Sequence, residues 1–225
     1  MTGTPVGGRV ATAGNPLRCA VLISGSGSGM QALVRAQQQD KLLHATSVVI
    51  SNRSEAGGIQ LAHQLGVEVE LVLPSKDAEN TRVAHEEAVM EVLEHHDIEF
   101  VVLSGYMRLL SPHFLERWGG RIVNIHPSYL PHFPGAHAHR DVLASGAKLT
   151  GCTVHMVDEG MDTGAVLAQE TVPVLNDDDE ISLSNRVKVE EHRLYPQVLN
   201  WIAQGYVTMK SGRVHVDVPQ SPQND

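Results

Sequence analysis

Short apolar runs alternate with segments of helical period along the first half of the chain. The runs are "LRCAVLI" (17–23), "ATSVVI" (45–50), "VEVELVL" (67–73), "FVVLSG" (100–105) and "RIVNIH" (121–126). Continuous apolar runs of this length are typical of strands that are buried on both faces. The segments between them predict helices from about Met30, over 57–66, from Thr81 to His95 and near 112–118. The alternation predicts an α/β fold, a Rossmann-like mononucleotide-binding parallel sheet of four or five strands flanked by helices.

The pattern changes beyond Pro127. A loop rich in Pro, His and Gly comes first, and two alternating segments follow near 149–157 and 163–174. This alternation predicts antiparallel strands that extend the sheet in the C-terminal half. A helix is expected from about Ser182 to Ala203, because the acidic residues before it suit a helix N-terminus.

The sequence pattern predicts one domain over residues 17–210. Residues 1–16 are small, polar and rich in Gly and Pro, without the apolar centre of a secretory signal, so they predict a disordered N-terminal extension. Residues 207–216 predict a terminal hairpin turning at "SG", so that 211–225 would hold the last strand and a frayed tail.

Composition and charge exclude several classes of protein. The net charge is −9 and no Lys/Arg cluster is interleaved with aromatic residues, which argues against a nucleic-acid partner. No apolar run approaches the roughly 20 residues that span a bilayer, so no membrane role is expected. Cys19 and Cys152 lie among β-forming residues and predict buried free thiols in a reducing cytoplasm. The sequence leaves open whether two copies form a homodimer.

A glycine-rich loop, "LISGSGSGM" (22–30), joins the first apolar run to the first helix. It lacks the third glycine of a dinucleotide fingerprint, and no acid follows the next strand at 51–53. It also lacks the Gly-Lys-Ser/Thr ending of a Walker loop. A strand, a loop of small residues and a helix N-terminus can still bind a monophosphate through free backbone N–H groups. A tight exposed turn explains the same loop equally well.

The segment "NIHPSYLPHFPGAHAHR" (124–140) carries the most chemical information. Asn124 and His126 lie at the carboxyl end of a predicted strand, where ligands of open α/β sheets bind, and they alternate with Ile125. An amide beside an imidazole can stabilise an oxyanion and carry a proton near neutral pH, as acyl transfer requires. A buried core histidine and a strand-end cap are the alternative explanation.

A zinc site is a second alternative for this segment. His126, His132, His137 and His139 fall within one loop, and imidazole is the commonest zinc ligand. The histidines have neither an H-E-x-x-H nor a paired-cysteine spacing, so we expect no metal.

Several motifs together resemble the phosphoribosylglycinamide formyltransferase family. They are Asn124-x-His126-Pro-Ser, Leu130-Pro131, Phe133-Pro-Gly-x-His137-x-His139-Arg140, Ser24-Gly25-x-Gly27-Ser28, "GYMRLLSP" (105–112), "VHMVDEGMDTG" (154–164) and "EHRLYP" (191–196). The resemblance covers nearly all of residues 17–210. The Asn-x-His-Pro-Ser core is shared with other folate enzymes that handle formyl groups, whereas the Phe-Pro-Gly-x-His-x-His continuation is more specific to this family.

The resemblance implies an activity in purine biosynthesis. The formyl group of 10-formyltetrahydrofolate, the co-substrate, would pass directly to the amine of glycinamide ribonucleotide, without a metal. Asn124, His126 and Asp162 match the catalytic residues. Asn124 and His126 would stabilise a tetrahedral oxyanion, while Asp162 would orient His126 and assist proton transfer.

The resemblance also implies binding residues for both substrates. Gly27, Ser28 and Gly29 would hold the 5′-monophosphate of the ribonucleotide, and Glu191 would contact its other polar groups. The family often has Asn where Gly29 stands, so this chain lacks one side-chain donor there but keeps the backbone N–H. The residues that match the folate site are Arg82, Met107, Arg108, Leu109, Leu110, Asn124, Asp158 and Asp162. His137 and His155 would support the site, and His132 would be peripheral.

Other functions remain open at this level. A hydrolase that releases formate from 10-formyltetrahydrofolate would share the three catalytic residues, but such enzymes usually carry an N-terminal regulatory domain that residues 1–16 cannot supply. Methionyl-tRNA formyltransferases add a C-terminal RNA-binding domain, which the acidic charge and the short C-terminal end disfavour. A non-catalytic sensor of a phosphorylated ligand would use the glycine loop alone.

Overall fold

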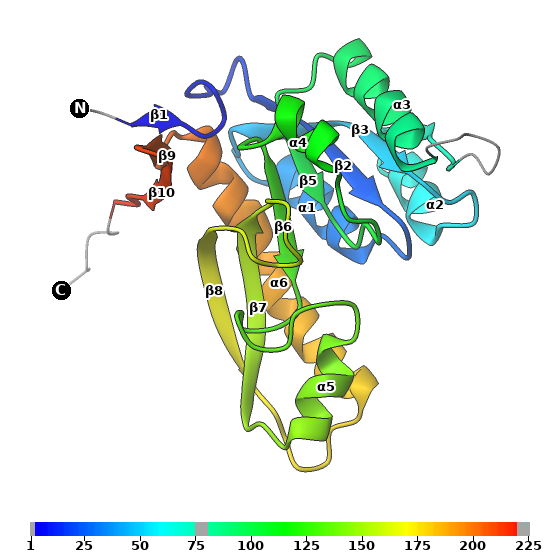
Figure 1. Ribbon diagram of the computed structural model, residues 1–225, viewed down its shortest axis with the longest axis vertical. Coiled ribbons are helices and arrows are strands. Elements are labelled where there is room, and N and C mark those ends of the chain that lie inside the picture. The colour runs from blue at the N-terminus through cyan, green and yellow to red at the C-terminus, as the bar shows by residue number, and fades with distance from the viewer. Residues whose placement is uncertain (1–2, 75–80, 220–225) are drawn as a thin grey trace.

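The computed structural model describes residues 3–74 and 81–219, and its main sheet has seven strands in the order β4-β3-β2-β5-β6-β7-β8 (Figure 1). The five strands from β4 to β6 are parallel, and β7 and β8 are antiparallel. Both the parallel sheet and its antiparallel extension were expected from the hydrophobic pattern. The strands are β2 (Leu17–Ile23), β3 (His44–Ser51), β4 (Glu68–Leu71), β5 (Phe100–Leu103), β6 (Ile122–His126), β7 (Leu149–Met156) and β8 (Val166–Pro173).

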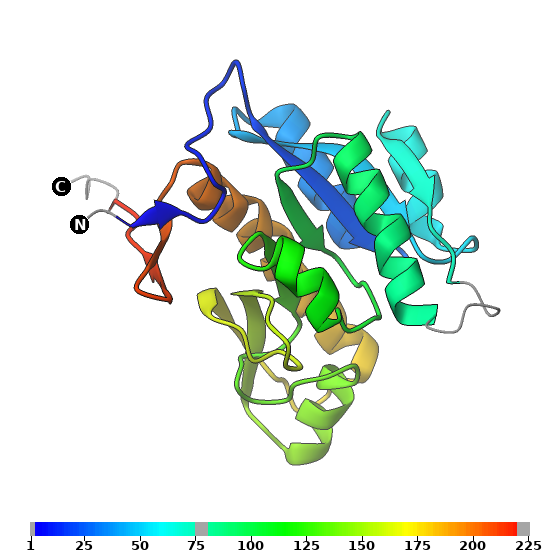
Figure 2. The same ribbon diagram turned by 45° about the horizontal axis from the view of Figure 1, so that its top comes forward.

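Helices cover both faces of this sheet. They are α1 (Ser28–Gln39), α2 (Gly57–Gln64), α3 (Thr81–His95), α4 (Pro112–Trp118), α5 (Ala138–Ser145) and α6 (Glu180–Ala203). Cys19, Val21 and Ile23 of β2 pack in the core under α1 and α6, whereas Ala20 and Leu22 pack in the core under α3 and α4. The continuous apolar run of β2 therefore reflects a strand that is buried on both sides. Figure 2 shows α3 and α4 on one side of the sheet and α1 and α6 on the other.

The long helix α6 ties the C-terminal half to the parallel strands. It starts at a capping box, in which the Asp179 carboxylate accepts from the Ser182 N–H and the Ser182 side chain bonds the Asp179 N–H. Near its other end, the buried Tyr195 hydroxyl lies 2.8 Å from the Leu103 carbonyl and 3.1 Å from the Val123 carbonyl. Because these carbonyls belong to β5 and β6, α6 is anchored to the two strands whose ends carry the predicted chemistry.

One helix was not predicted. The sequence pattern indicates a loop up to about residue 148, but α5 occupies Ala138–Ser145 and ends at Gly146, whose φ of 71° is in the left-handed region. Only Ala138 and Val142 of this helix are buried, so its apolar stripe is too narrow to stand out in the sequence.

The prediction that residues 1–16 are disordered is wrong for the described residues 3–16. β1 (Thr4–Pro5) pairs with β9 (Val207–Lys210), which pairs with β10 (Arg213–Val216) in a second, three-stranded sheet. The terminal hairpin β9–β10 was expected. Val6 and Ala11 are buried, and their N–H groups donate to the carbonyls of Val207 and Ala203. The segment is ordered by tertiary contacts that its polar composition does not indicate. Of the predicted frayed tail, residues 220–225 lie outside the described part.

Two further expectations concern the cysteines and the membrane. Cys19 and Cys152 are both free and buried, as predicted. Among residues 3–74 and 81–219, no helix is both long enough and apolar enough to cross a membrane.

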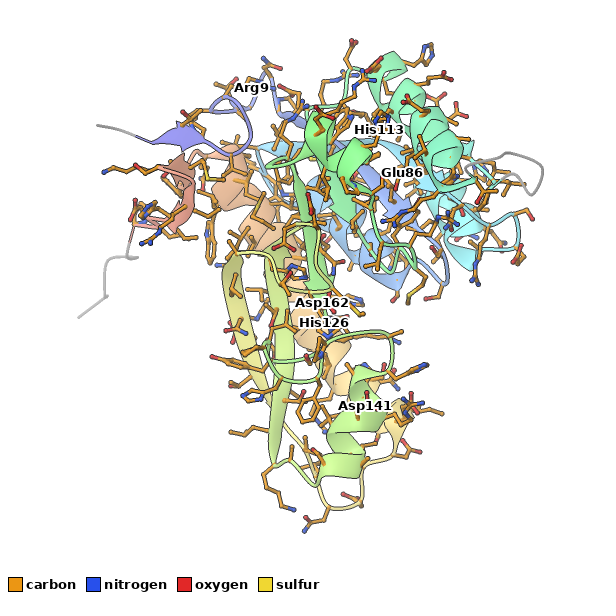
Figure 3. All side chains as sticks on the ribbon, viewed as in Figure 1. Arg9, Glu86, His113, His126, Asp141 and Asp162 are labelled. Carbon is orange, nitrogen blue, oxygen red and sulfur yellow. The ribbon has the colours of Figure 1, made fainter. Side chains whose placement is uncertain are left out.

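Arg9 holds the N-terminal segment against the end of the sheet (Figure 3). Its guanidinium binds both carboxylate oxygens of Glu99, at 2.5 and 2.7 Å. It also donates to the carbonyls of Asn15 and Pro16, each at 2.9 Å. The two charged side chains are about one-quarter exposed. A bidentate, partly buried pair of this kind contributes more than an ordinary surface ion pair.

We predict that Arg9→Gln lowers the free energy of unfolding by about 1 kcal/mol, because the substitution removes charge-assisted hydrogen bonds from a partly buried carboxylate. Urea denaturation measures this change. Arg35→Gln is the matched control, since Arg35 is exposed on α1 and should leave the midpoint unchanged. Equal midpoints for the two variants would show that the Arg9 contact does not stabilise the fold.

Candidate active site

Two of the proposed catalytic residues, Asn124 and His126, lie on β6 at the point where the sheet changes from parallel to antiparallel. The register of β7 against β6 places His155 opposite Asn124 and Thr153 opposite His126. Residues from two segments that are 31 positions apart thus meet at the carboxyl end of β6. Figure 3 shows His126 beside Asp162, which comes from a third segment.

Asp162 lies in the loop between β7 and β8. Its φ of 57° is left-handed, a conformation that Asp tolerates better than most residues. Asp158 helps to shape this loop, because its Oδ1 accepts hydrogen bonds from the Gly160 N–H at 3.1 Å and the Thr163 hydroxyl at 2.7 Å. The "DEGMDTG" turn is therefore folded so that the Asp162 carboxylate points back at β6.

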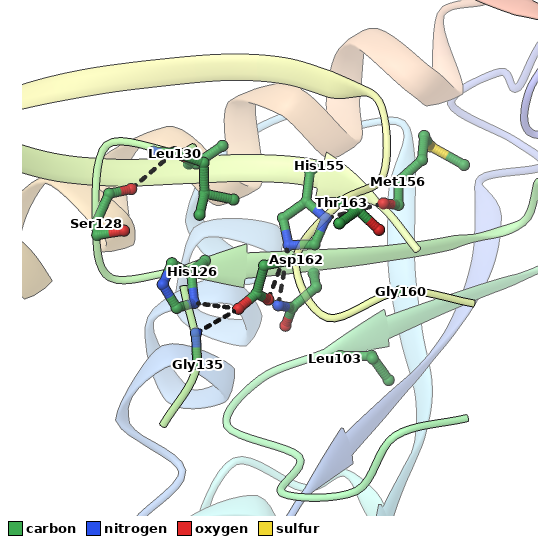
Figure 4. Close-up of polar contacts among 12 residues, drawn as sticks. Leu103, His126, Ser128, Leu130, Gly135, His155, Met156, Gly160, Asp162 and Thr163 are labelled. Carbon is green, nitrogen blue, oxygen red and sulfur yellow. Dashed lines mark hydrogen bonds and ion pairs between the residues drawn. The ribbon is translucent and has the colours of Figure 1, made fainter. Parts of the chain in front are cut away.

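Three groups contact the Asp162 carboxylate (Figure 4). Oδ2 lies 3.3 Å from His126 Nδ1 and accepts the Gly135 N–H at 2.8 Å, and Oδ1 lies 3.6 Å from His155 Nε2. Burial would raise the pKa of Asp162, but the nearby His155 ring, the hydrogen bond from the Gly135 N–H and the nearby His126 ring outweigh it, so that the pKa is lowered. Asp162 is therefore a carboxylate at neutral pH.

His126 is almost fully buried, at 4% exposure. Its Nε2 lies 2.9 Å from the Phe133 carbonyl, which can only accept, so Nε2 carries a hydrogen. In the neutral ring the lone pair on Nδ1 then faces Asp162, and protonation at Nδ1 converts this contact into an ion pair. Burial lowers the pKa of His126, against the opposing effects of the Phe133 carbonyl and Asp162. The resting ring is neutral and is placed to gain a proton next to a carboxylate.

His155 and Asn124 contact each other beside Asp162, and with His126 these residues form one polar cluster. His155 Nδ1 donates to the Met156 carbonyl at 2.8 Å, so in the neutral ring Nε2 accepts from Asn124 Nδ2 at 3.2 Å. An amide nitrogen has two hydrogens, and this contact uses one. The other hydrogen of Asn124 is available to a ligand at a fixed position.

A cavity opens directly beside Asn124 and Asp162. It is lined by Leu103, Tyr106, Arg108, Leu109, Leu110, Asn124, His155, Val157, Asp158, Glu159, Gly160 and Asp162. Six of the eight residues predicted to bind folate line it. The other two do not: Met107 is 64% exposed and its N–H donates to Ser24 Oγ at 2.9 Å, and Arg82 pairs with Glu86 at 3.5 Å. Leu103, Tyr106 and Val157 also line it and were not predicted, although Tyr106 and Val157 are neighbours in sequence of predicted residues.

The glycine loop forms the N-terminus of α1. Gly27 is the N-cap, with a left-handed φ of 74°, and no side chain caps the helix. A Cβ on Gly27 would lie 2.5 Å from the Cα of Gly58 in α2, so close packing also requires glycine here. The N–H groups of Ser28 and Gly29 have no acceptor in the part of the chain that the structure describes. Free N–H groups at a helix N-terminus form a site for an anion.

Glu191, the residue predicted to contact the ribonucleotide, is partly exposed on α6. Desolvation raises its pKa to about 7, while the charge of Lys188 acts in the opposite direction. Lys188 lies one turn earlier on α6, and it also lowers the pKa of His139 and His192, after desolvation as the main cause. Sequence reasoning missed Lys188. Its spacing of three residues from Glu191, on one helix face, was the available signal.

The loop histidines do not converge. His132 and His137 are exposed, and neither side chain forms a hydrogen bond or ion pair with Asp162 or Asn124. Of the two histidines predicted to support the site, His155 lies beside Asp162 and Asn124, whereas the His137 side chain contacts neither. Within the described ranges, one set of residues, on β4 and just after α3, brings three metal-ligating atoms within 4.8 Å of one another: Glu68, Glu70 and His96.

A parallel sheet with an acid–imidazole pair at its carboxyl edge is typical of α/β enzymes. Residues 17–199 match the formyl transferase family. The chain belongs to this family.

Individual relatives are similar over most of the chain. Phosphoribosylglycinamide formyltransferase of Escherichia coli is 37% identical over 202 residues, which cover 90% of this chain and 94% of that protein. The crystal structure of glycinamide ribonucleotide transformylase 1 from Symbiobacterium toebii has a TM-score of 0.84 at 39% identity, covering 89% of this chain and 94% of that one. The trifunctional purine biosynthetic protein adenosine-3 of Bos taurus is 41% identical over 198 residues, but the match spans 88% of this chain and only 19% of that protein.

We predict that His126 titrates below the usual value of about 6.5, because burial disfavours its charged form. In Asp162→Asn the titration moves to still lower pH, since the carboxylate that favours the imidazolium is gone. NMR of the histidine ring carbons as a function of pH measures both values. Asp158→Asn, which removes a carboxylate without a contact to His126, serves as the control. A His126 pKa that stays constant or rises in Asp162→Asn would contradict the ion pair.

Proposed function

We propose that this protein transfers the formyl group of 10-formyltetrahydrofolate to the amine of glycinamide ribonucleotide, a step of purine biosynthesis. The observation that carries the proposal is the contact of Asp162 with His126, 3.3 Å apart, beside the amide of Asn124 and a cavity. Membership of the formyl transferase family and the names of the similar proteins support the same reaction.

The two substrates would reach Asn124 along one edge of the sheet. The cavity beside Asn124 and Asp162 combines apolar walls from Leu109 and Leu110 with polar groups from Asp158, which suits a flat heterocycle with hydrogen-bonding edges. The free N–H groups at the start of α1 suit the phosphate of the ribonucleotide. Both sites lie at the carboxyl edge of the same sheet, because α1 follows β2 and Asn124 lies on β6.

Formyl transfer needs two things of the protein: stabilisation of negative charge on the formyl oxygen and removal of a proton from the attacking amine. The second N–H of Asn124 can donate to that oxygen. His126 can take up a proton at Nδ1, where Asp162 stabilises the resulting positive charge, and the imidazolium then adds to the stabilisation of the oxyanion. Because Nε2 of His126 is bonded to the Phe133 carbonyl, a direct hydrogen bond from His126 to the oxyanion requires exchange of that partner.

The atoms balance without a covalent enzyme intermediate. The amine nitrogen forms a bond to the formyl carbon, the bond from that carbon to N10 of the folate breaks, and N10 gains a proton as the amine loses one. The Asp162–His126 pair lies next to the reaction and can pass the proton from one nitrogen to the other.

The direct test is incubation of the protein with 10-formyltetrahydrofolate and glycinamide ribonucleotide. We expect equal amounts of tetrahydrofolate and formylated ribonucleotide. Release of formate without ribonucleotide would indicate a hydrolase instead, and tight binding of the ribonucleotide without any turnover would indicate a sensor.

We predict that Asp162→Asn binds both substrates but loses about 100-fold or more in turnover, because Asn keeps the size of the side chain and removes the charge that stabilises a positive His126. Single-turnover formyl transfer and calorimetric titration with each substrate separate chemistry from binding. Asp141→Asn, at an exposed position on α5, is the control and should behave as the wild type. Transfer by Asp162→Asn within about threefold of the wild-type rate would rule out this role.

We also predict that activity needs no metal ion, because the proposed chemistry uses only Asn124, His126 and Asp162. Dialysis against a chelator should leave the rate unchanged, and elemental analysis should find less than stoichiometric zinc. Loss of activity on chelation with recovery on adding zinc would overturn this prediction.

A further inference from the structure

Ser104 lies directly after β5, at the edge of the sheet that carries the glycine loop. Its N–H donates to the Leu22 carbonyl of β2 at 3.0 Å, and the next carbonyl, that of Gly105, accepts the Ser24 N–H at 3.2 Å. These bonds hold the backbone of Ser104 against the end of the strand from which the glycine loop departs.

The hydroxyl of Ser104 occupies the space above Gly29. A Cβ built on Gly29 would lie 2.7 Å from Ser104 Oγ and, apart from the backbone of α1 itself and the adjacent residues, within 4 Å of no other heavy atom in the described chain. A side chain at position 29 and the hydroxyl at position 104 therefore compete for one volume. In this protein the Ser104 hydroxyl occupies that volume.

In the described residues, this hydroxyl has no partner. Ser104 is 9% exposed, and its Oγ forms no hydrogen bond to any residue within 3–74 or 81–219. The Oγ atom itself still touches solvent, so a hydroxyl without a protein partner next to free N–H groups can bind a ligand or a water molecule. The N–H groups of Ser28 and Gly29 lie in the same first turn of α1.

We propose that Ser104 is a phosphate-binding residue of this protein, and that its hydroxyl supplies the side-chain donor which Gly29 lacks. The proposal rests on the proposed function, since the ligand is the 5′-phosphate of the ribonucleotide. The N–H groups of Ser28 and Gly29 and the hydroxyl of Ser104 converge on one anion, and a phosphate monoester has three terminal oxygens to accept them. Gly29 is then required because any side chain there would displace the hydroxyl.

The first experiment compares wild type with Ser104→Ala by calorimetry, using glycinamide ribonucleotide and the riboside that lacks its phosphate. We expect affinity for the ribonucleotide to fall about tenfold, the loss typical of one hydrogen bond to a charged group, and affinity for the riboside to stay constant. In kinetics, KM for the ribonucleotide should rise while kcat changes by less than about twofold. Ser184→Ala on α6 is the matched control. Equal losses for ribonucleotide and riboside, or a ribonucleotide affinity within twofold of wild type, would overturn the proposal.

The second experiment tests whether a side chain at position 29 and the Ser104 hydroxyl compete for the same space. Gly29→Asn alone should weaken ribonucleotide binding, because its side chain meets the Ser104 hydroxyl. Adding Ser104→Ala to Gly29→Asn should restore binding above that of either single variant, since the amide can then occupy the vacated space and donate to the phosphate. A double variant that binds no better than Gly29→Asn would contradict the proposal. Circular dichroism checks that each variant is folded.

Ribose 5-phosphate separates this inference from the proposed function. It carries the phosphate but no amine to formylate, so its binding reports on Ser104 whether or not the protein transfers a formyl group. If the wild type shows no formyl transfer, the proposed reaction is wrong. Weaker ribose 5-phosphate binding in Ser104→Ala would still support the phosphate site. Equal ribose 5-phosphate binding by wild type and Ser104→Ala would show that Ser104 does not bind the phosphate.

Discussion

The carboxylate of Asp162 is the contact on which the site depends. It joins the strand end at His126, the loop at Gly135 and the antiparallel strand at His155. These three segments meet at one partly buried charge, which the Gly135 N–H stabilises by a hydrogen bond and which a protonated His126 would stabilise further. The same contacts that stabilise the carboxylate orient the imidazole whose proton affinity the proposed reaction uses.

The position of this carboxylate follows from the change of direction in the sheet. β6 is the last parallel strand, and β7 returns along it in the opposite sense, so that His155 lies opposite Asn124. Because β7 runs antiparallel to β6, its last residue, Met156, lies opposite Val123, and the N–H of Val157 donates to the Ile122 carbonyl at 3.0 Å, beside the start of β6. The loop that follows then folds back along β6, so that the Asp162 carboxylate reaches His126 and Gly135.

The two proposed binding regions differ in how they are built. The folate cavity is lined mainly by two loops, one after β5 and one after β7. The phosphate region uses backbone groups at the start of α1, whose approach to α2 leaves no room for a side chain at Gly27. Because this site uses backbone N–H groups, it can still bind phosphate with glycine at position 29, provided that another side chain supplies the missing hydrogen-bond donor.

Local pattern alone was sufficient for much of this protein. Continuous apolar runs and helical periods identify the five parallel strands and most helices, because burial on two faces leaves a signal within a few residues. The motifs around Asn124, Asp158 and Gly27 identify the segments of the site, and their strand-end positions place them at one edge. The tertiary structure decided what depends on contacts between distant segments: the ordering of residues 3–16 by β9 and Glu99, the short helix α5, and the position of Ser104 beside Gly29. None of these can be read from periodicity, because the partner of each group lies on another element, and only the register of the strands and the packing of α6 bring the partners within bonding distance.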